Sequence, residues 1–157
     1  MSPWNELVLA CNLKQDVPQQ ILDLLKYIIE PPYNFETQTF EPIPTPEHAF
    51  FHYEDWQTIL LDDTYYFPGE RFASFVLDKQ NFYKFTTRTM VRRGDEIIPL
   101  FLQWLAPYMV TEGFVGYTRC DEDEQIDLIY FENGDVFYNS VRLWENPPQI
   151  ERVKINP

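Results

Sequence analysis

Residues 82–109, FYKFTTRTMVRRGDEIIPLFLQWLAPYM, have the pattern of a strand that runs directly into a helix. The odd-numbered positions of the first ten residues hold aromatic, threonine or valine side chains. Lys84, Arg88 and Arg92 lie at even-numbered positions, and a period of two is typical of a strand with one face in water. The first part of the stretch is therefore predicted to be a strand.

The second part of the stretch predicts a helix that begins with a turn and a cap. Gly94 permits a tight turn, and Asp95 belongs to the residues that favour helix N-caps. The apolar side chains that follow recur at helical spacing. They are Ile98, Phe101, Leu102 and Leu105. Pro107 is expected to lie near the end of this helix.

The beginning of the chain repeats this order. In ELVLACNLKQDVPQQILDLLKYII, residues 6–29, an alternating segment predicts a strand, and Asp16 and Pro18 predict the cap and first turn of a helix. The apolar residues of this helix lie 77 positions before those of the second one: Ile21, Leu24, Leu25 and Ile28. Because the identity of the two segments is slight, internal duplication and convergence are both open explanations.

Further strands are predicted in both halves of the chain. In the second half, residues 113–120 and the run after them alternate, and Asn133-Gly134 between two alternating runs is a strong hairpin signal. In the first half, the candidate strands are HAFFHY at 48–53 and RFASFVLD at 71–78, and DKQN turns the chain after the second of them.

Together these elements predict an α+β fold with a mostly antiparallel sheet of six to seven strands and two helices on one face. A duplicated ferredoxin-like β-α-β-β unit is one arrangement with this order. The chain has the size of one domain, so we expect a single domain over 1–157. Its halves are expected at about 5–78 and 82–142, followed by a short C-terminal tail at 143–157.

An insert at residues 31–70 interrupts the first half. It holds six prolines and ten aromatic residues, whereas disordered linkers are poor in aromatics. We therefore expect the insert to bury its rings, either as a lid over one end of the sheet or against a partner, with a short helix at 54–61. Long ordered loops often carry function, so a site is expected here.

The net charge of −13 is unevenly distributed. Residues 1–70 hold twelve acids and two bases, residues 71–93 hold one acid and six bases, and residues 94–157 hold twelve acids and four bases. A strongly acidic surface repels phosphate backbones and anionic lipids and favours basic partners. The sequence therefore argues against nucleic acid and membranes as partners and for a basic protein.

The sequence predicts no metal, no cofactor and no catalytic residue. His48 and His52 share one face in a helix or a strand, but no third ligand for zinc can be named. Residues 121–132 resemble a calcium-loop series, yet Ile126 occupies the position that needs glycine. The five glycines form none of the loops that cradle nucleotide phosphates.

Two functions from different classes fit these observations. The first is a non-catalytic acidic protein-interaction module, such as an inhibitor or an immunity-type protein, that binds a basic partner. The alternative is a small-ligand-binding or enzymatic domain with a pocket under the 31–70 segment. The tentative binding residues of this pocket are Trp56, Tyr65, Tyr66, His52, Arg88 and Arg92.

The remaining expectations concern assembly and location. A homodimer would be a third way to cover the aromatic insert. No apolar run reaches 18 residues, and the first residues lack a basic region followed by an apolar stretch. We therefore expect no membrane contact and a cytoplasmic location.

Overall fold

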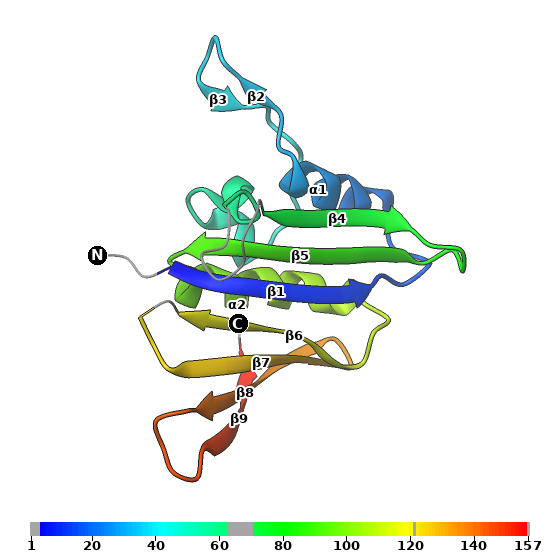
Figure 1. Cartoon of the computed structure of the whole chain (residues 1–157). Helices are drawn as coiled ribbons and strands as arrows, with labels where there is room; N and C mark the ends of the chain where they lie inside the picture. Colours follow the sequence, from blue (N-terminus) through cyan, green and yellow to red (C-terminus); the bar gives the residue numbers. More distant parts are fainter. Residues whose placement is uncertain (1–3, 63–70, 121, 157) are drawn as a thin grey trace.

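Seven strands form one antiparallel sheet in the computed structural model, which describes residues 4–62, 71–120 and 122–156. The strand order is β4-β5-β1-β6-β7-β8-β9 (Figure 1). These strands are β1 (Trp4–Asn12), β4 (Phe72–Leu77), β5 (Tyr83–Arg92), β6 (Gly113–Cys120), β7 (Gln125–Glu132), β8 (Asp135–Arg142) and β9 (Gln149–Ile155). The helices are α1 (Gln19–Ile29) and α2 (Gly94–Leu105), with short 3-10 helices η1 (Ala49–His52), η2 (Trp56–Thr58) and η3 (Ala106–Tyr108). A separate two-stranded ribbon consists of β2 (Tyr33–Asn34) and β3 (Thr39–Phe40).

The two strand–helix–strand units interlock. In the sheet, β5 lies between β1 and β4 of the β1-α1-β4 unit. In the same way, β1 lies between β5 and β6 of the β5-α2-β6 unit. Figure 1 shows both helices behind the sheet, on the same face. The predicted sheet-rich α+β fold is therefore confirmed, whereas the ferredoxin-like duplication stays a prediction.

The two faces of the sheet differ as the alternation in the sequence predicted. Leu7 and Leu9 of β1 lie opposite Thr89 and Thr87 of β5, and all four are fully buried on the side of the helices. The other side, which no described helix covers, is called the open face below. It carries Lys84, Arg88 and Arg92 of β5.

The core lies between the sheet and the helices. Every apolar helix position predicted from the sequence is at most 2% exposed: Ile21, Leu24, Leu25, Ile28, Ile98, Phe101, Leu102 and Leu105. Burial of such a side chain contributes about 1.5–3 kcal/mol to folding. Phe50 of the insert is also fully buried and stacks on Trp104 with ring centroids 5.8 Å apart.

Both helices begin differently from the prediction. The N-cap residue of α1 is Pro18, two residues after Asp16, and its carbonyl oxygen accepts hydrogen bonds from the N–H groups of Ile21 and Leu22. α2 begins at Gly94 itself, after Arg93 in the left-handed conformation (φ 56°). A Cβ at position 94 would lie 2.5 Å from the Cβ of Asn5, so glycine is required by close packing against β1.

The predicted strand at 48–53 is wrong, because η1 occupies these residues. Nδ1 of His48 accepts a hydrogen bond from the N–H of Phe50 and caps the turn. A strand would send the rings of Phe50 and Phe51 to opposite faces, whereas in η1 both contact Trp104. The expected short helix at 54–61 is present as η2 and has only three residues.

The chain end is also more ordered than predicted. The expected tail at 143–157 contains β9, which pairs with β8 along seven residues and extends the sheet. The hairpin between β7 and β8 turns at Asn133 and Gly134 as predicted, and both have positive φ angles.

In the part of the chain that the structure describes, neither α-helix is long and apolar enough to cross a membrane.

Candidate functional site

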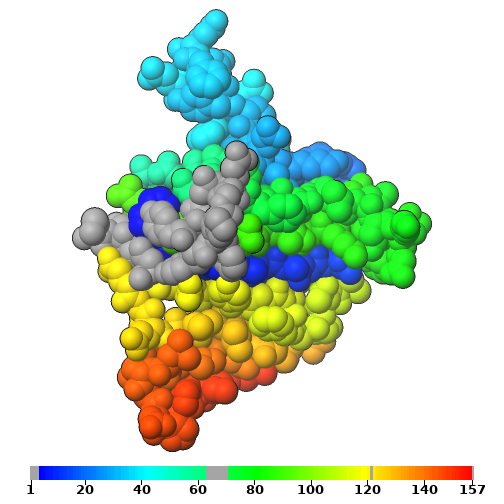
Figure 2. Space-filling model, viewed as in Figure 1, coloured from blue at the N-terminus to red at the C-terminus, as the bar shows by residue number. Residues whose placement is uncertain are grey.

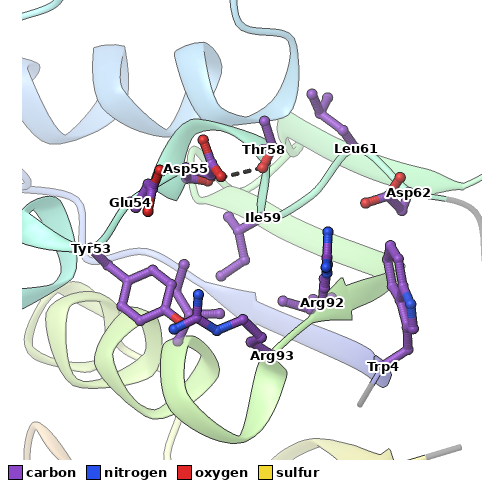
Figure 3. Close-up of a pocket in the computed structure, with 12 residues that line it drawn as sticks. Trp4, Tyr53, Glu54, Asp55, Thr58, Ile59, Leu61, Asp62, Arg92 and Arg93 are labelled. Atoms are coloured by element: carbon purple, nitrogen blue, oxygen red, sulfur yellow. Dashed lines mark hydrogen bonds between the residues drawn. The ribbon is translucent and has the colours of Figure 1, made fainter. Parts of the chain in front are cut away.

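A pocket of about 590 Å³ lies at the end of the sheet where β1 begins and β5 ends (Figure 3). The insert supplies one wall with the segment from Tyr53 to Asp62, and Ile97 of α2 contributes to the apolar floor with Ile59 and Val91. The pocket therefore lies against the 31–70 segment, and its role in ligand binding stays a prediction.

Two consecutive arginines from the end of β5 line the pocket. Arg92 lies directly opposite Trp4 in the β1–β5 register, and Figure 3 shows the two side chains next to each other. Arg92 is exposed and forms no hydrogen bond or ion pair with any residue that the structure describes. Its guanidinium is therefore available to an anionic group.

Arg93 belongs to a polar cluster that joins the insert to α2. The hydroxyl of Tyr53 donates a 2.7 Å hydrogen bond to Oε2 of Glu96, and Nη2 of Arg93 donates a 2.9 Å bond to the same oxygen. The guanidinium of Arg93 also lies 5.3 Å from the centre of the Tyr53 ring. These contacts fix the side of the pocket nearest to α2.

The same cluster shifts the ionisation of its members. Burial, and next the hydrogen bond to Glu96, raise the pKa of Tyr53 to about 12. The hydrogen bonds from Tyr53 and Arg93 lower the pKa of Glu96 below its usual range. At neutral pH the cluster therefore holds an anionic Glu96 between a neutral phenol and a cationic guanidinium.

The wall formed by the insert is acidic. Glu54, Asp55 and Asp62 line the pocket opposite the arginines, and Figure 3 shows them along the loop that crosses above the sheet. Oγ1 of Thr58 donates a 2.9 Å hydrogen bond to the carbonyl oxygen of Asp55, which holds the turn of this loop. The pocket therefore presents opposite charges on facing walls.

Of the predicted binding residues that the structure describes, only Arg92 lines this pocket. Trp56 is buried in the core against Tyr27, Phe50 and Phe51 and does not line this pocket. His52 is exposed outside the pocket, with Nε2 2.8 Å from Oε1 of Glu47.

Tyr65 and Tyr66 lie outside the described residues, so their predicted role stays a prediction. Arg88 lies on the open face, in a second polar cluster. There the hydroxyl of Tyr117 donates a 2.6 Å hydrogen bond to Oε1 of the fully buried Glu6. Burial, and next this hydrogen bond, raise the pKa of Tyr117 to about 12, while the charges of Arg119 and Arg88 act to lower it.

The ribbon β2–β3 is a further candidate for a contact surface. Together with its flanks it forms residues 31–42, called the arm below, which project from the body beside α1 (Figures 1 and 2). The ring of Tyr33 packs edge-on against Phe35 and Phe40. Phe35 is nevertheless 84% exposed and Tyr33 41% exposed. The rings of the arm are therefore not buried as a lid over the sheet, and their burial against a partner stays a prediction.

Local hydrogen bonds give the arm its shape. Oδ1 of Asn34 accepts bonds from the N–H groups of Glu36 and Thr37, which closes the turn at the tip. At the base, the hydroxyl of Tyr27 donates a 2.6 Å bond to the carbonyl oxygen of Glu41. The exposed rings are thus held on an ordered ribbon.

The binding residues predicted from the sequence do not include Trp4, Tyr53, Arg93 or Phe35. The charge pattern contained one relevant signal, because no lysine or arginine occurs between Lys26 and Arg71 while nine acids do. Among the described residues, no group of three or more histidine, cysteine and acidic side chains is arranged to hold a metal ion. Comparisons with protein-family models, with curated proteins and with solved structures found no match.

Proposed function

We propose that this chain is a non-catalytic acidic protein-interaction module that binds a basic partner protein, as an inhibitor or an immunity-type protein does. The observation that carries the proposal is the arm, which presents aromatic rings to solvent within a 44-residue stretch, 27–70, that has no lysine or arginine. Aromatic side chains anchor protein interfaces, and complementary charge steers the encounter.

The chemistry of the arm supports a basic partner. Glu36 and Glu41 lie in the arm, and Glu30 at the end of α1 precedes it. A cationic groove on a partner would meet these carboxylates around the rings of Phe35 and Tyr33. Exposed rings on an ordered ribbon also lose little conformational entropy on binding, which favours affinity.

The distribution of charge over the sheet supports the same conclusion. Strand residues on the open face include six of the twelve lysines and arginines of the chain: Lys84, Arg88, Arg92, Arg119, Arg152 and Lys154. Only three acids lie among them, namely Glu6, Glu132 and Asp135. The acidic excess is therefore concentrated on the arm, the rest of the insert, the helices and the loops, where a basic partner would be attracted.

Site-specific photocrosslinking in the native host tests the proposal. One variant carries p-benzoylphenylalanine at Phe35, and a matched control carries it at Trp144, which is 52% exposed in the loop after β8. We expect the Phe35 position to form an adduct with a protein of net positive charge, identified by mass spectrometry, and the Trp144 position to form none with that protein.

The purified partner then provides the quantitative test. We expect its affinity to fall with rising salt and to fall by about tenfold or more in Phe35→Ala and in the double variant Glu36→Lys/Glu41→Lys. A partner that binds these variants as tightly as the original chain, or no adduct at Phe35, would reject the proposal.

A second candidate function rests on the pocket. Arg92, which lacks a described partner, lines it beside Trp4, and this arrangement suits a small anionic ligand with an apolar or aromatic part. Thermal-shift measurements against inorganic phosphate and a set of aromatic carboxylates test it, with Arg92→Gln as the control. Stabilisation that disappears in Arg92→Gln is expected if this function is correct.

We further propose that the chain is a single domain that acts in the cytoplasm, with the interlocked units as a duplicated ferredoxin-like arrangement. The support is that the two strands of each unit flank one strand of the other unit in the sheet. Neither unit therefore has a complete sheet alone. Calorimetry should then show one cooperative transition, with equal calorimetric and van't Hoff enthalpies. Two separate transitions would contradict the single domain.

A further inference from the structure

The two edges of the sheet have opposite characters. β9 forms one edge and carries Glu151, Arg152 and Lys154, and charged side chains on an edge strand oppose pairing with another chain. β4 forms the other edge, and its sequence FASFVL contains no charged residue and no proline. Within β4, neither a charged residue nor a proline protects the edge.

The side chains of β4 are open to solvent as well. Phe72 is 49% exposed, and Val76 and Leu77 are each 54% exposed. The N–H of Asp78 donates to the carbonyl oxygen of Phe82, so the backbone groups of residue 78 point toward β5. In an antiparallel ladder the direction of the backbone N–H and C=O groups alternates from residue to residue. The backbone groups of Ala73, Phe75 and Leu77 therefore point outward, away from β5.

We propose that β4 is the interface with a second copy of this chain, with the two β4 strands antiparallel so that both sheets become continuous. A two-fold axis at Ser74 places Ser74 opposite Ser74 of the second copy and Phe72 opposite Val76. On the helix side it places Phe75 opposite the small Ala73. The register centred on Phe75 would instead oppose Phe72 to Asp78 and Arg71 to Lys79, and is therefore disfavoured.

The charge of the β4 strand does not oppose a contact between two copies. The net charge of −13 opposes self-association over most of the surface, but β4 has no charged side chain, so the proposed register places no like charges opposite each other within the strand. Near the edge, Lys84 lies 3.7 Å from Asp78, which offsets its charge. Because the β9 edge is charged, pairing stops at a closed two-fold dimer and does not continue into a filament.

The mass in solution tests this interface. Light scattering of the full chain from about 1 to about 100 µM should give twice the 18.9 kDa of one chain at the upper end. Val76→Lys places a charge on the edge and should weaken the dimer by about tenfold or more. The matched control Ile150→Lys, on the opposite edge at a 67% exposed residue, should leave it unchanged.

Crosslinking provides a second readout that does not depend on a disruptive variant. The backbone N–H and C=O groups of Ser74 point toward β5. Ser74 and its counterpart in the second copy therefore form a non-hydrogen-bonded pair with Cα atoms about 4.5 Å apart, within the range for a disulfide. Ser74→Cys should therefore form a covalent dimer on mild oxidation, whereas Gln149→Cys on β9 should not. A monomer at every concentration, or a dimer that Ile150→Lys weakens as much as Val76→Lys does, would overturn the proposal.

Discussion

The hydroxyl of Tyr53 donates a 2.7 Å hydrogen bond to Oε2 of Glu96, and this bond joins the insert to the first turn of α2. The carboxylate also lies where the positive end of the helix dipole favours negative charge. We expect Tyr53→Phe to lower the melting temperature by about 2–4 °C and to speed amide exchange in η1 and η2. Calorimetry and hydrogen exchange measure the two effects.

The same bond predicts a dependence on pH. The pKa of Glu96 is lower in the folded chain than its ordinary value of 4.5. Its contribution to stability is therefore complete above that value and is lost as the pH falls through the lower, folded pKa. The difference in melting temperature between the original chain and Tyr53→Phe should shrink between pH 6 and pH 3, and a constant difference would contradict this assignment.

The hydrogen bond from Tyr117 to Glu6 should be visible in the ionisation of the phenol. The pKa of Tyr117 is raised to about 12, so folding favours the protonated form, and the associated stability is lost as the pH rises from 10 toward 12. Tyrosine-selective carbon NMR of the ring should show late titration of Tyr117. Because the charge of Glu6 raises this pKa, Glu6→Gln should shift the titration to lower pH, and an unchanged midpoint would contradict the assignment.

Phe50 is expected to be the main anchor of the insert on the body. Its ring is fully buried and contacts Trp56, Phe101 and Trp104. Phe50→Ala should lower the free energy of unfolding by about 3–5 kcal/mol, since it leaves a cavity among these rings. In the control Phe35→Ala, the removed ring lies in solvent and the change should stay within about 0.5 kcal/mol. Chemical denaturation measures both, and similar losses would show that the anchor is elsewhere.

Gly116 is expected to be indispensable for the contact between β1 and β6. It lies at an irregularity of the β6–β7 register with φ 156°, and a Cβ there would overlap the carbonyl oxygen of Val8. Gly116→Ala should therefore cost about 3 kcal/mol or more. Gly113 also has a positive φ, but a Cβ there meets nothing within 4 Å, so Gly113→Ala should cost only about 1 kcal/mol. Equal losses in denaturation experiments would contradict the role of close approach.

Local pattern by itself determined the two helices, their buried faces, the strands β1 and β4 to β8, and the turns between adjacent strands. These features depend on residues a few positions apart, such as the alternation along β5 or the Asn133-Gly134 turn, so the sequence contains their signal.

Only the tertiary structure decided which segments are buried and which residues meet. The aromatic residues of 48–53 favour a strand locally, but the burial of Phe50 against α2, about fifty residues away in the sequence, favours a 3-10 helix. The arm is as aromatic as its neighbours and still projects, because Phe35 packs against Tyr33 of the arm itself and stays 84% exposed. The pocket combines Trp4, the segment 53–62 and Arg92, and no local pattern encodes a contact between segments so far apart in the chain.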